Sequence, residues 1–145
     1  MTMPVEYTTA RPSRSVLQAM GRGWRSRCPN CGEGRLFRAY LKVVDRCAVC
    51  GTELFHQRAD DAPPYFVTLI TGHIVVPAAL ATEVAFAPPI WVHALLWGPL
   101  TLGLALGLLQ PVKGAIVGWQ WATYMHGFDP DYVDDELPPR EDGRP

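Results

Sequence analysis

Two long apolar runs, separated by a short proline-rich turn, dominate the middle of the chain. The first covers residues 65–86 and the second residues 90–110, so each has about 21 or 22 residues, enough at 1.5 Å per residue to cross the roughly 30 Å hydrocarbon core of a bilayer. Between residues 62 and 112 the one acid or base other than histidine is Glu83. The pattern predicts a transmembrane hairpin over residues 63–111, with helices at 65–86 and 90–110.

The turn between the two runs is Ala87-Pro88-Pro89. Proline removes a backbone donor and disfavours the helical conformation of the residue before it, so the two helices are predicted to be antiparallel neighbours. The alternative is a pair of buried core helices in a water-soluble protein. The remaining residues, about 95, are polar and rich in loop-forming types, and they are too few to cover two such helices.

Residues 1–25 are basic and contain a short amphipathic segment. Val16, Leu17, Met20 and Trp24 have helical spacing, with arginines around them. Such a segment is predicted to lie along an anionic membrane surface, and a partly disordered arm is the alternative.

The chain after the second run has two parts of different character. Residues 112–128 are aromatic and too short for a third crossing, which predicts an interfacial helix with its tryptophans at headgroup depth. Gly114 and Gly118 form a GxxxG pair, the pattern of a surface against which a partner helix packs closely. Residues 129–145 are acidic and proline-rich and predict a disordered tail.

The net charge of −1 hides a strong asymmetry. Residues 1–62 hold ten Lys and Arg against six Asp and Glu, whereas residues 112–145 hold three against seven. Basic residues near the ends of membrane helices favour the cytoplasmic side, and Lys113 closely follows the second run. We therefore expect a multi-pass membrane protein with both termini cytoplasmic. The first run begins too far along the chain for a cleaved signal peptide.

All four cysteines fall within one short segment, in the pattern CxxC, fifteen residues, CxxC. Two such pairs are typical of a tetrahedral zinc site, because two intervening residues let both sulfurs of a turn face one ion. The predicted zinc ligands are Cys28, Cys31, Cys47 and Cys50. The site has four ligands and no open position, which predicts a structural metal rather than a catalytic one.

Each cysteine pair lies in the same six-residue pattern, Arg-Cys-x-x-Cys-Gly. Gly32 and Gly51 are predicted to adopt positive φ, so that backbone N–H groups point at sulfur. Arg27 and Arg46 are placed to offset the charge of four thiolates. The β-rich stretch between the pairs predicts the hairpin of a zinc-ribbon-like module over residues 26–62.

Three other uses of these cysteines compete with zinc binding: disulfides, redox catalysis and iron binding. Disulfides are disfavoured because the predicted compartment is reducing. Redox catalysis commonly uses one CxxC in a βαβ context, which is absent from this sequence. Iron bound by the same four thiolates stays open, because iron accepts the same ligands.

Three ionisable residues fall within the predicted spans. Glu83 and His93 lie at similar depth near the outer ends of the two helices and are natural partners, and such groups in a membrane are functional candidates. An ordinary interfacial role is the favoured alternative. His73, near the middle of the first span, is a weak candidate for metal or haem binding with a partner chain, and a hydrogen-bonded packing residue is the favoured reading.

The pattern resembles a bacterial family known as domain of unknown function 983, or DUF983. The resemblance rests on residues 28–37, 41–51, 59–66, 72–77 and 113–128. It implies a small two-helix inner-membrane protein with a cytoplasmic zinc-ribbon-like head, and it implies no activity. Members are often encoded near terminal oxidase subunits and assembly factors, which associates the family with assembly of respiratory complexes.

The expected fold is a small α+β membrane protein: an N-terminal zinc-ribbon-like β module, a two-helix transmembrane hairpin and a C-terminal interfacial helix. Length leaves room for about one domain and excludes a multidomain enzyme. We expect a non-enzymatic scaffold or assembly factor that contacts the lipid bilayer and either another membrane protein or a second copy of itself. Metal or haem handling by the intramembrane histidines and Glu83 is the first alternative, and membrane-tethered nucleic-acid binding is a weaker one. No small-molecule substrate is evident.

Overall fold

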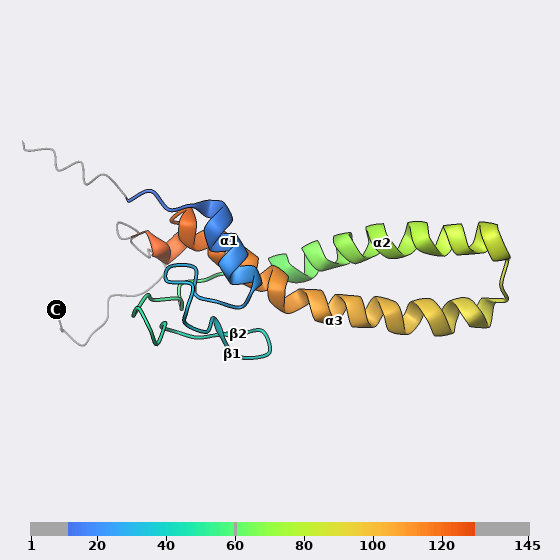
Figure 1. Ribbon diagram of the computed structural model, residues 1–145, viewed down its shortest axis with the longest axis horizontal. Helices are drawn as coiled ribbons and strands as arrows, with labels where there is room; N and C mark the ends of the chain where they lie inside the picture. Colours follow the sequence, from blue (N-terminus) through green and yellow to red (C-terminus); the bar gives the residue numbers. More distant parts are fainter. Residues whose placement is uncertain (1–11, 60, 130–145) are drawn as a thin grey trace, which may run out of the picture.

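A long helical hairpin projects from one end of a smaller head (Figure 1). The computed structural model describes residues 12–59 and 61–129. Most of the predicted acidic tail and the first part of the predicted basic arm lie outside the described residues. The elements, in chain order, are α1 (Val16–Trp24), β1 (Phe37–Ala39), β2 (Lys42–Val43), α2 (Ala62–Phe86), α3 (Ile90–Ala122) and the 3₁₀ turn η1 (His126–Phe128).

The first helix of the hairpin, α2, has 25 residues and begins with prolines in its first turn. Proline is well suited to this position, because the first N–H groups of a helix have no partner within the helix. The helix ends at Phe86, and the next residue, Ala87, has a left-handed φ of 43° that reverses the chain before Pro88 and Pro89. The antiparallel pairing of α2 with α3 was predicted from this turn.

Both hairpin helices carry their apolar side chains on the outside. Their mean hydropathy is 1.6 and 1.7, and almost none of their most apolar residues are buried within the chain. Val84 is 88% exposed and Ile90 is 83% exposed. The helices are therefore long and apolar enough to cross a membrane, and their most apolar stretches lie outside the buried core of the head.

The second hairpin helix is longer than the sequence predicted. α3 has 33 residues and runs through Pro99 and Pro111 into the head (Figure 1). The separate interfacial helix predicted over 112–128 is not present. Residues 112–122 continue α3, and most of them are buried. Trp121 and most of the small residues of this stretch are buried in the head, whereas Trp119 is 41% exposed.

The partner of the predicted GxxxG surface is α1 of the same chain. Gly114 and Gly118 of α3 contact Gly23 and Ala19 of α1 so closely that an added Cβ would overlap the facing backbone carbonyl at either glycine. Small residues on both helices allow this backbone approach. The predicted arm is therefore a helix packed on α3, in which Ala19 is buried and Leu17 is 84% exposed.

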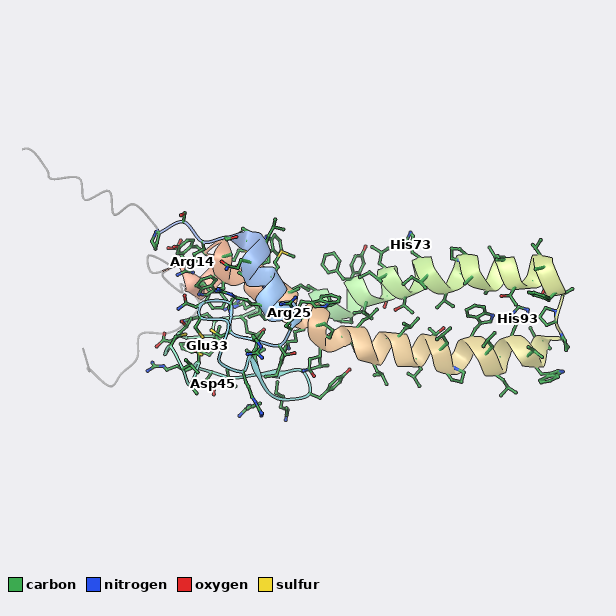
Figure 2. All side chains as sticks on the ribbon, in the orientation of Figure 1. Arg14, Arg25, Glu33, Asp45, His73 and His93 are labelled. Atoms are coloured by element: carbon green, nitrogen blue, oxygen red, sulfur yellow. The ribbon has the colours of Figure 1, made fainter. Side chains whose placement is uncertain are left out.

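An arginine before α1 holds its start against the end of α3 (Figure 2). Arg14 donates from Nη1 to the Trp121 carbonyl at 2.6 Å, and its guanidinium lies over the rings of Trp121 and Tyr124 at 4.2 and 3.9 Å. The Tyr124 hydroxyl in turn donates to the Pro12 carbonyl at 2.7 Å. Cation–π contacts of this kind contribute about 0.5–2 kcal/mol each.

The core of the head collects residues from every part of the chain. Leu36, Leu54 and Val117 are fully buried, and Val67 at the start of α2 is 2% exposed. The antiparallel hairpin β1–β2 pairs Phe37 with Val43, in the β-rich stretch predicted between the two cysteine pairs. The sheet, α1 and the last third of α3 thus share one apolar core.

We predict that Gly114→Ala destabilises the protein. The new Cβ must push apart two backbones, and overpacking of this kind costs about 1–3 kcal/mol. Gly107→Ala, in the same helix with open space around it, is the matched control and should be neutral or stabilising by up to about 1 kcal/mol. Thermal and chemical unfolding in detergent measure the stability of each variant. Equal stability of the two variants would contradict the close packing of α1 on α3.

Candidate metal centre

The four predicted ligands lie together in the head. Their sulfur atoms are all within 4.8 Å of one another, and they come from two turns that flank the β1–β2 hairpin. Because the hairpin reverses the chain, residues 28–31 and residues 47–50 meet although a strand pair separates them. We call these turns the first and second knuckle.

The two knuckles have the same backbone geometry. The Gly32 N–H donates to the Cys28 carbonyl at 2.9 Å, and the Gly51 N–H donates to the Cys47 carbonyl at 3.0 Å. The φ angles of these glycines are 75° and 73°, which is the positive-φ conformation the sequence predicted. Glycine adopts this conformation without the steric cost that a Cβ imposes.

The sulfur–sulfur distances fit one tetrahedral ion. Cys28 Sγ lies 3.7 Å from Cys50 Sγ, and Cys31 Sγ lies 3.8 Å from Cys47 Sγ. A zinc ion with bonds of about 2.3 Å to four thiolates places its ligands about 3.8 Å apart. A disulfide needs sulfurs about 2.05 Å apart, and all four cysteines are free thiols. The donor set therefore fits a zinc ion, and iron with four thiolates fits the same positions.

Burial and hydrogen bonding set the acidity of the thiols. Burial raises the pKa of Cys28 to about 12. The backbone N–H groups of Gly34 and Glu33, each 3.5 Å from Cys31 Sγ, lower the pKa of that thiol. Burial acts to raise the pKa of Cys50 as well, but hydrogen bonds from Thr52, Cys47 and Cys31 together outweigh it and lower the pKa to about 6. The less buried thiols thus favour the thiolate form that binds metal.

A polar bridge that the sequence analysis missed joins the two knuckles. Asn30 of the first knuckle donates from Nδ2 to Thr52 Oγ1 at 2.8 Å and lies 3.7 Å from Cys50 Sγ. Thr52 Oγ1 is itself 3.1 Å from Cys50 Sγ. Through these contacts, Asn30 of the first knuckle helps to hold Cys50, a ligand of the second knuckle, in place. Its one sequence signal is a polar residue inside a CxxC pair, which alone indicates no partner.

Gly34 is a second residue that the sequence analysis missed. A Cβ at this position would overlap Cys47 Sγ of the opposite knuckle. The sequence shows a glycine three residues beyond the second ligand, in Cys31-Gly-Glu-Gly. Spacing alone does not reveal that the Cys47 sulfur occupies the position that a side chain at residue 34 would need.

An arginine of α1, rather than the two arginines of the cysteine motifs, holds the first knuckle. Arg22 donates from Nη1 to the carbonyls of Pro29 at 3.1 Å and Asn30 at 2.5 Å. Arg46 was predicted to offset the charge of the thiolates. In the structure it forms an exposed ion pair with Glu53 at 2.5 Å. Helix α1 therefore couples the metal centre to α3.

The three ionisable residues of the predicted membrane spans do not form one site. His93 Nε2 lies 2.9 Å from Glu83 Oε2, joining the far ends of α2 and α3, as their predicted common depth allows. His73 Nδ1 instead contacts the Leu69 carbonyl at 2.8 Å, and Figure 2 shows this ring on the side of α2 away from α3. Within residues 12–59 and 61–129, the four cysteines form the one group of potential ligands close enough to hold a metal.

We predict one zinc ion per purified chain. Cys47→Ser should abolish high-affinity binding, because it removes a buried ligand and serine is a poor zinc ligand. Elemental analysis gives the stoichiometry and separates zinc from iron. A metal-free protein with fully reactive thiols would contradict this assignment.

A competitive zinc titration tests the contact at Gly34. Gly34→Ala should weaken zinc affinity at least about tenfold, since displacement of one ligand costs more than about 1.4 kcal/mol. Gly21→Ala, a helical glycine with no atom within 4 Å of the added Cβ, is the matched control and should bind zinc normally. Equal affinity in both variants would show that the Cys47 sulfur is not held against Gly34.

Comparisons with known proteins give a family and no activity. The model of the family described as "Protein of unknown function (DUF983)" matches residues 37–121. This segment includes the second knuckle and nearly all of both long helices, whereas the first knuckle precedes it. No curated protein and no solved structure matches the chain. Because the match covers more than half of the sequence, the chain belongs to the DUF983 family.

Proposed function

We propose that the protein is an inner-membrane scaffold or assembly factor, anchored by α2 and α3 and carrying a structural zinc centre in a cytoplasmic head. The observation that carries the proposal is the combination of a closed four-thiol centre with an outward-facing apolar hairpin in one continuous body. The head supplies a rigid surface for a partner, and the hairpin fixes that surface beside the membrane.

The exposed surface of the hairpin supports its placement in a bilayer. Large apolar side chains are exposed along α2 and along α3 as far as Leu106, and water-soluble proteins rarely present so extended an apolar surface. All backbone polar groups inside a membrane need partners, which a pair of continuous helices provides. The excess of basic residues before α2 supports a cytoplasmic head.

The geometry of the metal centre supports a structural role. Four thiolates complete a tetrahedral coordination sphere and leave no position for a substrate or a water nucleophile. Zinc bound in this way would supply folding free energy to a head that is small and rich in loops. This chemistry supports a non-enzymatic role for the metal centre.

Two exposed apolar side chains, in and shortly after the second knuckle, support contact with another protein. Val49 of the knuckle is 58% exposed, and Phe55, five residues beyond its last cysteine, is 55% exposed. Aromatic side chains are enriched in the buried cores of protein interfaces. A partner in the same membrane, such as a respiratory oxidase subunit, would contact these side chains.

The proposed topology can be tested with reporter fusions. A fluorescent protein that folds only in the cytoplasm should be active when fused after Pro145, and alkaline phosphatase at the same position should be inactive. Inserted at the turn of residues 87–89, the two reporters should give the opposite result. Active alkaline phosphatase at the C-terminus would overturn the topology.

Partner capture tests the scaffold role. Affinity purification in mild detergent should recover a membrane-protein partner with the wild-type chain, and Val49→Ser/Phe55→Ser should reduce recovery about tenfold, the effect of one or two contact residues worth about 1 kcal/mol or more each. Leu17→Ser, which removes an exposed apolar side chain of α1, is the control. Zinc content should be unchanged in both. Undiminished recovery with the double variant would reject the second knuckle as the contact surface.

A further inference from the structure

A basic pocket lies where the head meets the hairpin, beside the metal centre. Its volume is about 390 Å³. Figure 2 shows Arg25 at the end of the head that faces the hairpin. We call it the arginine pocket, and its lining residues are Arg25, Ser26, Arg27, Glu33, Gly34, Arg35, Phe37 and Gln110.

Two of its arginines are held directly opposite each other. Arg27 and Arg35 form an isolated antiparallel bridge. The hydrogen bonds from the Cys28 N–H to the Gly34 carbonyl at 2.8 Å and from the Leu36 N–H to the Ser26 carbonyl at 3.0 Å flank the bridge, which makes it the closer, non-hydrogen-bonded kind of pair. Residues opposite each other in such a pair project to the same face, and like charges there repel.

No carboxylate in the described part of the chain pairs with these guanidinium groups. Glu53 pairs with Arg46 and with His56, away from the pocket, and Glu33 is the one acid lining the pocket. Three arginines and one glutamate leave the pocket with a formal charge of +2. A bound anion would offset the repulsion that the fold imposes on Arg27 and Arg35.

The pocket lies at the level where α3 changes from exposed and apolar to buried. Gln110, the last residue of the predicted span, lines the pocket and donates from Nε2 to Ser26 Oγ at 3.2 Å. One turn farther into the hairpin, the Tyr40 hydroxyl donates to the Leu106 carbonyl at 2.6 Å. With the hairpin in a bilayer, as the proposed function has it, this level is the headgroup region of the leaflet on the side of the head.

We propose that the arginine pocket binds the phosphodiester of an anionic phospholipid, such as phosphatidylglycerol. The forked guanidinium groups match phosphate oxygens in geometry and charge. The acyl chains lie along the exposed apolar surface of α3, where Leu102 is 61% and Leu106 is 49% exposed. Leu106 and Leu102 lie one and two helical turns before Gln110 of the pocket, and this nearby apolar surface favours a lipid over free phosphate. The inference rests on the proposed membrane placement.

Native mass spectrometry of the full-length protein in detergent tests the proposal. Added phosphatidylglycerol should bind as one tightly held lipid per chain, whereas phosphatidylcholine should not. Arg27→Gln/Arg35→Gln should weaken phosphatidylglycerol binding at least about tenfold, the effect of losing one or more charge-assisted hydrogen bonds. Lys42→Gln/Arg46→Gln removes the same charge outside the pocket and should leave binding unchanged.

Three results would overturn the proposal. Equal weakening in both double variants would show diffuse surface attraction, and weakening in neither would show that the pocket holds no lipid. Displacement of the lipid by equimolar inorganic phosphate would make free phosphate the ligand.

A variant that fails to fold is identified by its zinc content. If Arg27→Gln/Arg35→Gln loses zinc, Arg25→Gln compared with Arg46→Gln repeats the test without altering the bridged pair, and equal binding in those two variants would overturn the proposal. Lipid binding in detergent is measured independently of topology and of partner capture, so failure of the scaffold role leaves this result intact.

Discussion

The structure depends on one backbone-to-backbone contact, between α1 and the last third of α3. Gly114 and Gly118 let α1 approach so closely that no side chain fits between the helices. Arg22, one turn along α1, then reaches the carbonyls of the first knuckle. Without this contact the cysteine-bearing loops would lack a fixed support, and α3 would end at the hairpin instead of entering the core of the head.

The features that could be predicted from the sequence are those with a fixed period or spacing. The apolar runs have the length of a bilayer crossing, and the paired CxxC motifs have the spacing of a metal knuckle, so both identify their elements locally. The shared depth of Glu83 and His93 follows from the antiparallel hairpin, and their side chains hydrogen-bond in the structure. The family resemblance agrees with the match over residues 37–121.

The features that could not be predicted depend on contacts between distant parts of the chain. Pro111 and Lys113 are typical of the end of a membrane helix. The structure shows that α3 continues past them, packed against α1, which lies about 90 residues earlier in the sequence, and no local pattern reveals this contact. The GxxxG pair indicated a close helix contact but could not show that the partner belongs to the same chain. Gly34 faces a sulfur of the other knuckle, a contact that exists only after the β1–β2 hairpin has folded.

The uninterrupted length of α3 has a mechanical consequence. A helix of 33 residues is about 50 Å long, and its two ends belong to the hairpin and to the core of the head. If the hairpin lies in a bilayer, a change in its tilt would be transmitted along α3 and would turn the cysteine-bearing head with it. Membrane thickness, which sets the tilt of a spanning helix, would then set the direction in which the head faces.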